Sequence, residues 1–449
     1  MKNNHSLIEK YVYNLYNALR DAYYASNFGF SVIRLIFLKY AADNSLGSCN
    51  MNDMSAYLRL HKMLSAVGKT NIGANAIAPV LSIIDNHYGL NGLLSSTADE
   101  FASDLFGLDI EKTRQTASEK NISLIFESLN QMDLEDDQKF SKGKALASAL
   151  VDNMHRYMAS RYTAPHVSRN ELCTLAKRIL KINDSDVFMD FAAGIGATST
   201  AITENTNCRV INYDIDPNVL PISAMLHIMS GINNFTFAQK DFTQLISNSN
   251  TSTVNKIFVD PALITGYLGQ RELRILAIDT ATHLLSDNGK AIITATAGTL
   301  SNGATRLVQQ RKAFVNERFI SHVVALPITW ASTTATINLI ILTKTKNDHI
   351  LMVNACSNTF KGYVEPQSAR MARLSPPISE EGIDLLVDII NNKKEVPALS
   401  RKVSIDEIIN RNYDIFPATY IFETSKIDLT IDAIDKELAE LYNSLQLLI

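Results

Sequence analysis

The chain has 449 residues, of which 46% are hydrophobic and 20% are charged, as in ordinary soluble globular proteins. This length predicts two or three domains that each bury a core of their own. The formal net charge is −4, whereas a protein that grips DNA unaided usually carries a basic excess. The longest apolar runs are strand-sized, as at 337–343, so no membrane-spanning helix is predicted.

The N-terminus, "MKNNHSLIEKY", lacks the apolar core of a signal peptide, and we expect a cytoplasmic protein. The cysteines lie far apart and form no CxxC pair, so the sequence predicts neither a zinc site nor a disulfide framework. We interpret all four as reduced thiols: Cys49, Cys173, Cys208 and Cys356.

Residues 1–145 predict an N-terminal helical domain. Apolar residues in "HSLIEKYVYNLYNAL" recur at the spacing of one helix face. A second apolar helix is predicted at 30–42. The stretch "QMDLEDDQKFSKGK" at 131–144 is polar and acidic, and we interpret it as a hinge that precedes the change of domain.

Short apolar runs alternate with helical segments from about residue 185. This pattern predicts βαβ units and an α/β domain over 146–355, with a mostly parallel, doubly wound sheet. Sheets of this kind bind ligands at the carboxyl ends of their strands. The predicted strands are 187–192, 209–216, 235–242, 256–261, 290–296, 322–327 and 337–345.

Residues 356–449 form a C-terminal extension that ends in a predicted helix at 427–449. Isoleucines and leucines alternate four and three residues apart there, which is a heptad seam. Two interpretations stay open. The helix packs on its own domain, or it pairs as a coiled coil with a partner chain or with a second copy in a homodimer.

The first strand-to-helix turn, "DFAAGIGATS", carries a G-x-G pattern that lets the backbone approach a ligand closely. It lacks the third glycine of the dinucleotide fingerprint, which favours a nucleoside ligand without a pyrophosphate. Acidic residues end the first three strands, at Asp190, Asp214 and Asp241. An acid about twenty residues after the glycines can accept hydrogen bonds from ribose hydroxyls. The set therefore predicts an S-adenosylmethionine pocket.

Several segments carry a family resemblance. "RLIFLKYAAD" (34–43) resembles the helical N-terminal signature of the modification (M) subunits of type I restriction-modification systems, a family of adenine-N6 DNA methyltransferases. "RYTAP" (161–165) resembles their Y-T-P cofactor motif with Ala164 inserted, and the glycine turn resembles D-P-A-C-G-T-G-G with Phe191 for proline. "VSIDEIINRNYDIFPATYI" (403–421) is similar to a segment near the family's C-terminus.

The resemblance implies a Rossmann-like, class I S-adenosylmethionine-dependent methyltransferase domain that takes its DNA target from a separate specificity subunit. It implies that Tyr162 and Thr163 flank the methionine end of the cofactor and that Asp214 binds the ribose. Asp241 and Phe242 would contact the adenine. The amino-acid portion would be lined by Asp190, Ala192, Gly194 and Gly196.

The segment "KIFVDPALIT" (256–265) resembles the family's catalytic loop, Asn/Asp-Pro-Pro-aromatic. The Asp260 carboxylate and the Pro261 carbonyl can accept the two protons of the adenine amine, which turns the nitrogen lone pair toward the methyl group. Ala262 replaces the second proline, and Leu263 replaces the aromatic residue that stacks on the flipped base. We therefore predict a weakened site, with Asp260, Pro261 and Leu263 as its catalytic positions.

Three functions stay open. The first is an adenine-N6 DNA methyltransferase subunit. The second is a pseudo-methyltransferase that serves as a cofactor-binding or scaffold protein in a defence complex, as the changes at Ala262 and Leu263 favour. The third is an RNA or small-molecule methyltransferase, which the N-terminal helical segment disfavours. Basic clusters, such as that at 306–312, are either phosphate contacts or solvated faces.

Overall fold

A computed structural model describes residues 2–22, 28–65, 73–106, 119–137, 139–158, 167–248, 254–261, 267–268, 271–329, 336–357, 359–360 and 378–421. The predicted heptad helix at 427–449 lies outside these residues, as do Tyr162, Thr163, Ala262 and Leu263.

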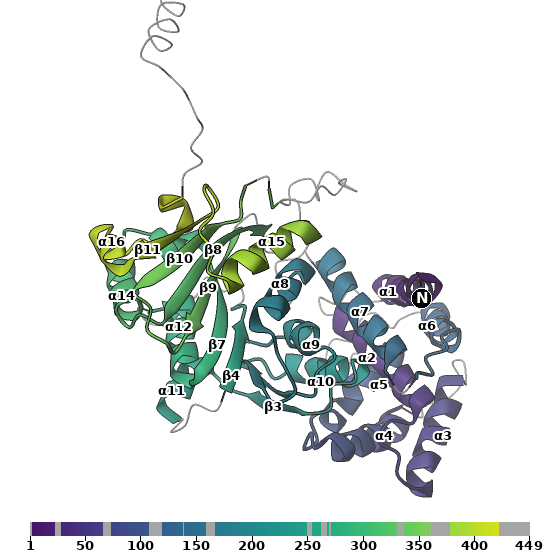
Figure 1. The fold of residues 1–449 in the computed structure, drawn as a ribbon. Coiled ribbons are helices and arrows are strands. Elements are labelled where there is room, and N and C mark those ends of the chain that lie inside the picture. Colours follow the sequence, from purple (N-terminus) through teal and green to yellow (C-terminus); the bar gives the residue numbers. More distant parts are fainter. Residues whose placement is uncertain are drawn as a thin grey trace, which may run out of the picture.

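The described part of residues 2–158 is built of helices, which form a layer beside the sheet (Figure 1). In the first helix, Val12, Leu15 and Leu19 lie three to four residues apart and are fully buried, because this spacing places them on one face. The second helix is apolar around most of its circumference and lies inside the layer. The helices are α1 (Lys2–Ala22), α2 (Phe28–Asn44), α3 (Met51–Ser65), α4 (Gly73–Tyr88), α5 (Ala98–Phe106), α6 (Glu119–Asn130) and α7 (Ser141–Met158), with a 3-10 turn η1 (Ser95–Thr97).

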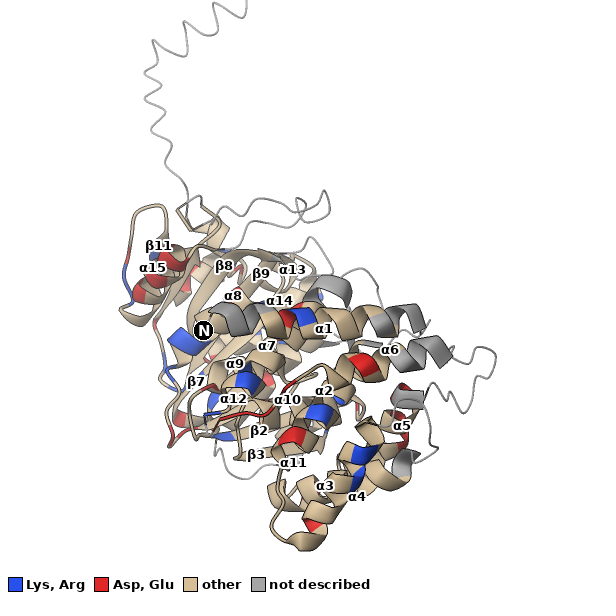
Figure 2. Cartoon of the chain, turned by 90° about the vertical axis from the view of Figure 1, so that its right-hand side faces the viewer, with Lys and Arg blue, Asp and Glu red and all other residues tan. Residues whose placement is uncertain are grey.

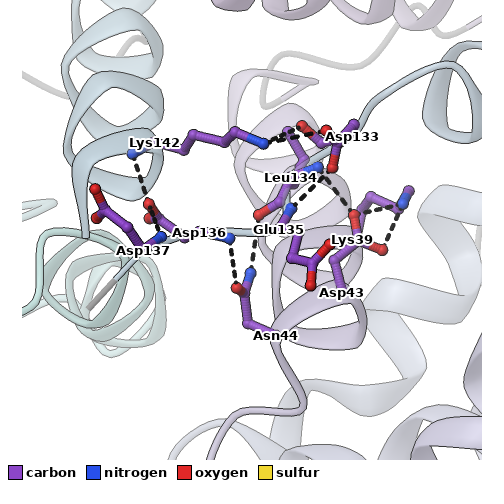
Figure 3. Close-up of polar contacts among 9 residues, drawn as sticks. All are labelled: Lys39, Asp43, Asn44, Asp133, Leu134, Glu135, Asp136, Asp137 and Lys142. Carbon is purple, nitrogen blue, oxygen red and sulfur yellow. Dashed lines mark hydrogen bonds and ion pairs between the residues drawn. The ribbon is translucent and has the colours of Figure 1, made fainter. Parts of the chain in front are cut away.

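The acidic segment before α7 is fastened to α2, so its interpretation as a hinge is wrong (Figure 3). Asn44 donates to the carbonyl of Leu134 at 2.9 Å and accepts from the amide of Asp136 at 2.8 Å. The Asp136 carboxylate accepts from the Tyr40 hydroxyl at 2.9 Å and from the amide of Gly143 at 2.6 Å. The Asp136 side chain therefore ties the start of α7 to α2.

The sheet has nine strands in the order β11-β10-β8-β9-β7-β4-β1-β2-β3. Most neighbours are parallel, as predicted, whereas β9 is antiparallel to both β7 and β8, and β11 is antiparallel to β10. The strands are β1 (Val187–Asp190), β2 (Arg209–Asp214), β3 (Phe235–Gln239), β4 (Val254–Val259), β7 (Leu285–Ala295), β8 (Ile320–Thr329), β9 (Thr336–Thr343), β10 (His349–Asn354) and β11 (Ser400–Ser404). A separate two-stranded ribbon pairs β5 (Tyr267–Leu268) with β6 (Arg271–Glu272).

Helices cover both faces of this sheet (Figure 1). On one face, α8 and α15 pack in a core with Phe188, Phe258 and Ile292, and on the other, α12, α14 and α16 pack with Met189, Ile257 and Ile293. The alternation of neighbouring strand residues between two cores is the period of two expected for a doubly covered sheet. The helices are α8 (Asn170–Leu180), α9 (Ala197–Thr203), α10 (Val219–Met229), α11 (Leu245–Asn248), α12 (Leu273–Leu284), α13 (Ala297–Ser301), α14 (Thr305–Asn316), α15 (Glu380–Asn391) and α16 (Ile405–Asn410), with 3-10 turns η2 (Phe242–Gln244) and η4 (Pro417–Thr419).

Helix α10 joins the helical layer to the sheet. Every residue of this helix is buried, and its apolar side chains share one core with α1 to α7. The approach of α7 is so close that a Cβ atom at Gly143 would lie 2.1 Å from the carbonyl oxygen of Met229. The packing therefore runs across the predicted boundary at 145–146, and the three-part division of the chain stays a prediction.

Candidate functional site

The order of the strands reverses between β1 and β4, which is the position where doubly wound sheets place their ligands. Asp190 ends β1 and Asp260 directly follows β4, so the parallel register brings both carboxylates to one edge. They line a cavity of about 20 Å³. Its lining comprises Val167, Ser168, Asp190, Ala192, Ala193, Ile195, Ala197, Thr198 and Asp260.

Asp260 is buried and accepts hydrogen bonds from two hydroxyl groups. Ser168 Oγ lies 2.6 Å from one carboxylate oxygen, and Thr294 Oγ1, on β7, lies 2.5 Å from the other. Pro261 is also buried, whereas Leu263 lies outside the described residues. Our sequence reasoning missed Ser168 and Thr294. The available signal was Thr294, a hydroxyl residue in the apolar run 290–295 that requires a buried partner; Ser168, between Val167 and Arg169, carries no such signal.

Asp190 is a buried acid with a sparse set of donors. The residue is 2% exposed, and its carboxylate accepts from the amide of Ala192 at 3.0 Å. Burial raises the pKa of the Asp190 carboxyl well above its ordinary value, and the nearby charges of Asp214 and Asp260 act in the same direction. A cationic ligand group beside Asp190 would reverse this effect, because it favours the ionised carboxylate.

Asp214 connects the end of β2 to the glycine turn. Its two carboxylate oxygens accept from the amides of Gly194 at 2.7 Å and Asp216 at 3.0 Å. Burial raises the pKa of Asp214 above its ordinary value, although these amide bonds oppose the shift. Gly194 and Gly196 have φ angles of 52° and 74°, which L side chains rarely adopt. The structure thus brings the predicted ribose-binding acid and both predicted glycines together.

A buried polar network lies directly beneath the glycine turn. His227, on α10, faces the carbonyl of Ser223 through Nδ1 at 2.7 Å and Ser199 Oγ through Nε2 at 3.1 Å. Burial lowers the pKa of His227 to about 4, so the ring is neutral at pH 7. Because Nδ1 faces a carbonyl, it must carry the proton and Nε2 must accept. Asn212 also donates to Ser199 Oγ, at 2.8 Å.

Replacing Gly196 with alanine is expected to destabilise the protein by roughly 2–5 kcal/mol, the sum of a left-handed backbone penalty and overpacking. A Cβ atom there would lie 2.1 Å from Ser223 Oγ and 2.8 Å from His227 Cε1. Urea unfolding measures the loss. Gly89→Ala is the matched control, because Gly89 has a φ of 65° but no atom within 4 Å of its added Cβ. Equal losses in the two variants would show that the network beneath Gly196 exerts no steric constraint.

The third strand ends in a cap and an apolar wall. Asp241 precedes the η2 turn and accepts from the amide of Thr243 at 2.9 Å, so part of its acceptor capacity is structural. The half-buried Phe242 ring lies 5.3 Å from the ring of Phe191. Phe191 stands where the motif D-P-A-C-G-T-G-G has its proline, and it is a buried support for the Phe242 ring. Ile215, a residue that we did not select, is 62% exposed at the end of β2 and adds apolar surface at the same edge.

Only some residues of the basic cluster at 306–312 lie on the surface. Arg311 is buried and donates to the carbonyls of Tyr413 at 2.9 Å, Thr299 at 3.3 Å and Asn302 at 2.8 Å. Arg311 therefore faces neither phosphates nor solvent, whereas Arg306 and Lys312 are exposed, so both interpretations of the cluster stay open for them. Within the described residues, no group of three or more His, Cys, Asp or Glu side chains is placed to hold a metal ion. No described helix is long and apolar enough to cross a membrane.

Two comparisons of sequence relate this chain to DNA methylases. Residues 234–428 match the protein family described as N-6 DNA Methylase. A stretch of 166 residues, 36% of this chain, is 30% identical to the type I restriction enzyme MpnII methylase subunit of Mycoplasma pneumoniae. The match spans only 28% of that relative's length.

Solved structures share the fold over nearly the whole chain. The type I restriction-modification system methyltransferase subunit from Streptococcus thermophilus aligns with a TM-score of 0.69 at 14% identity, covering 93% of this chain and 100% of its own. A chain from a study of complex assembly in a type I R-M system aligns with a TM-score of 0.60 at 11% identity. The alignment covers 97% of this chain and 95% of the other. The fold is thus the Rossmann-like α/β fold of the Streptococcus thermophilus methyltransferase subunit, with an N-terminal helical region, as predicted.

Proposed function

From the match of residues 234–428 to the N-6 DNA Methylase family, we propose that this chain is the modification subunit of a type I restriction-modification system. It transfers a methyl group from S-adenosylmethionine to the N6 amine of adenine in DNA. The observation that carries this proposal is the placement of Asp260. A hydrogen-bonded carboxylate stands at the switch point of the sheet, in one cavity with Asp190.

The residues at the switch point fit the chemistry of S-adenosylmethionine. The acidic cavity around Asp190 suits the cationic amino-acid end of the cofactor, because the carboxyl groups of both Asp190 and Asp260 line it. Asp214 suits the ribose, and Phe242 with Ile215 suits the adenine. When bound, the cofactor supplies an electrophilic methyl group. Tyr162 and Thr163, outside the described residues, are proposed at its methionine end.

The protein's own contribution to the reaction is to prepare the adenine amine. The amine is a poor nucleophile because its lone pair is delocalised into the ring. The Asp260 carboxylate and the Pro261 carbonyl accept its protons in hydrogen bonds, which localises the lone pair on nitrogen. Leu263 provides apolar contact to the extruded base but no π-face. Asp260→Ala should therefore remove transfer.

DNA recognition is assigned to a partner specificity subunit. The net charge of −4 gives this chain no general attraction for phosphates. In Figure 2, acidic and basic residues of the coloured part of the chain are interspersed over the helical layer rather than gathered into one basic face. The test is transfer of a labelled methyl group to unmethylated genomic DNA by the complex with the specificity subunit.

A second candidate is a pseudo-methyltransferase that binds the cofactor or acts as a scaffold in a defence complex. The observation that favours it is the pair of replacements in the catalytic loop, Ala262 and Leu263, which weaken the hold on the base. The two candidates differ in turnover. A complex that binds DNA and S-adenosylmethionine but transfers no methyl group supports the second candidate and contradicts the first.

S-adenosylmethionine is expected to bind more tightly as the pH rises. The pKa values of Asp190 and Asp214 are raised by burial, so both acids keep protons above the ordinary carboxyl range. A cationic ligand binds their ionised forms, and binding therefore releases protons, while affinity falls as the pH is lowered through the raised pKa values. Calorimetry at several pH values, in two buffers of different ionisation enthalpy, measures both effects.

Asp214→Ala is expected to weaken this binding about tenfold or more, because it removes a charge-assisted acceptor and the anchor of Gly194. Asp287→Ala is the matched control, since Asp287 is an exposed acid at the opposite end of β7. Equal affinities for the two variants, or affinity that is independent of pH, would contradict the assignment of the cofactor to this edge.

A further inference from the structure

Asp260 is held by donors that reach it from two separate segments. Ser168 comes from the chain just before α8, and Thr294 comes from β7, the neighbour of β4 in the sheet. Each hydroxyl donates to a different carboxylate oxygen, at 2.6 Å and 2.5 Å. The residues Ser168, Asp260 and Thr294 are 6%, 5% and 0% exposed, so the bonds are shielded from water and are correspondingly strong.

Two donors on opposite oxygens fix the orientation of a carboxylate. The terminal torsion of an aspartate is broad, with no steep minimum of its own. Each carboxylate oxygen has two acceptor positions. When a hydroxyl from one side and a hydroxyl from the other each fill one position, the plane of the group is set. The directions of the remaining positions are set with it.

Orientation matters more at Asp260 than at an ordinary buried acid. Proton acceptance from an amine requires an oxygen within hydrogen-bond reach and in line with the N–H bond, and small misplacements lower rates strongly. The hydroxyl bonds also favour the ionised carboxylate, which is the form that can accept. Both effects act on the same atoms that the proposed reaction uses.

We propose that Ser168 and Thr294 are positioning residues for methyl transfer, which hold the ionised Asp260 carboxylate at the cavity that it shares with Asp190. This inference rests on the function proposed above. The competing explanation is that the hydroxyls merely solvate a buried charge. In that case their removal lowers the stability of the protein, whereas the rate and pH dependence of the reaction stay unchanged.

The variants separate the hydroxyl group from the shape of the side chain. Thr294→Val keeps the shape and removes the donor, and Thr294→Ser keeps the donor. Ser168→Ala removes the second donor. Thr282→Val is the matched control, because Thr282 is a buried threonine whose hydroxyl donates to the carbonyl of Ile278 at 2.9 Å, away from Asp260. All are prepared as complexes with the specificity subunit.

Single-turnover transfer from labelled S-adenosylmethionine to unmethylated genomic DNA is the main measurement. Thr294→Val and Ser168→Ala are each expected to lower the rate about 10- to 100-fold, the effect of one hydrogen bond to a charged group. The acid limb of the pH–rate profile should move to higher pH. Thr294→Ser should stay within about threefold of the wild type, because it retains the donor. Calorimetry of Thr294→Val should give wild-type affinity for S-adenosylmethionine, because Thr294 does not line the cavity.

The outcomes distinguish this inference from the proposed function. An active wild-type complex with unchanged rates and pH profiles in Thr294→Val and Ser168→Ala overturns the inference alone. The inference is also overturned if the transfer rate of Thr294→Val falls no further than that of Thr282→Val. It is overturned as well if the rate of Thr294→Ser is as low as that of Thr294→Val. A wild-type complex that binds DNA and cofactor but transfers no methyl group contradicts the proposed function and this inference with it.

Discussion

Replacing Leu263 with phenylalanine is expected to raise the rate of methyl transfer roughly 5- to 150-fold, because stacking of a base on an aromatic side chain is worth about 1–3 kcal/mol. The catalytic loop reads Asp260-Pro261-Ala262-Leu263. Under the function proposed above, this loop keeps the proton-accepting groups of Asp260 and Pro261 and has no aromatic residue to hold the extruded base. Adding Ala262→Pro should raise the free energy of unfolding by about 0.4–1 kcal/mol, because proline restricts the unfolded chain.

The measurement is single-turnover transfer to unmethylated genomic DNA in complex with the specificity subunit. Leu263→Met is the matched control, since methionine is large and apolar but has no π-face. A phenylalanine variant no faster than the methionine variant would mean that stacking at this position does not limit the reaction. If the phenylalanine variant binds the cofactor and still transfers nothing, the pseudo-methyltransferase becomes the better description.

Arg311→Ala is expected to lower the free energy of unfolding by about 3–5 kcal/mol. The buried guanidinium joins α14 to the segment after β7 and to the C-terminal segment through the carbonyls of Thr299, Asn302 and Tyr413. Of these carbonyls, that of Thr299 is buried, and a buried carbonyl that loses its donor costs about 1–3 kcal/mol; the removed side chain leaves a cavity that adds to the loss. Equilibrium unfolding in urea gives the value.

Lys312→Ala controls for the loss of a positive charge in the same cluster, because Lys312 is the exposed neighbour. Its expected effect on stability is within about 0.5 kcal/mol, as for most surface substitutions. If Arg311 instead contacted phosphates, its alanine variant would keep wild-type stability and lose DNA affinity in a salt-dependent manner. That result would contradict the structural role assigned here.

The sheet and its switch point were predictable because they depend on local patterns. Apolar runs of strand length mark the buried strands, and an acid at the end of a run marks a carboxyl edge. Asp190, Asp214 and Asp260 could therefore be selected without coordinates. The direction in which each strand runs followed from the helices between them, and the antiparallel β9 was not separable from its neighbours by pattern alone.

The partners of those acids were not predictable, because the partners are remote in sequence. Ser168 is 92 residues and Thr294 is 34 residues from Asp260. The acidic segment before α7 illustrates the same limit. Its composition indicates an exposed hinge, but the Tyr40 hydroxyl that binds Asp136 is 96 residues away. The polarity of a segment indicates that it needs hydrogen-bond partners, but it does not indicate which residues those partners are.

Arg311 shows how composition alone can mislead. A cluster of cations in a polar stretch usually faces solvent, and nothing near it in sequence distinguishes Arg311 from Lys312. The distinction comes from Tyr413, about a hundred residues later, whose carbonyl needs a donor inside the protein. Similarly, His227 lies in a helix whose other residues, apart from Ser223, are apolar, and only the folded chain reveals the hydroxyl of Ser199 that faces it.

Helix α10 has a consequence for recombination between relatives. Its side chains fill one core with α1 to α7, while its His227 supports the glycine turn of the sheet. A chimaera that takes its N-terminal helices from a relative of this protein would therefore join the α10 surface to helices that were never selected to fit it. The natural crossover point is not the sequence boundary near residue 145. A chimaera must take α1 to α7 and α10 from the same parent protein. The segment that carries Gly194 and Gly196 must come from that parent too, because His227 on α10 packs beneath it.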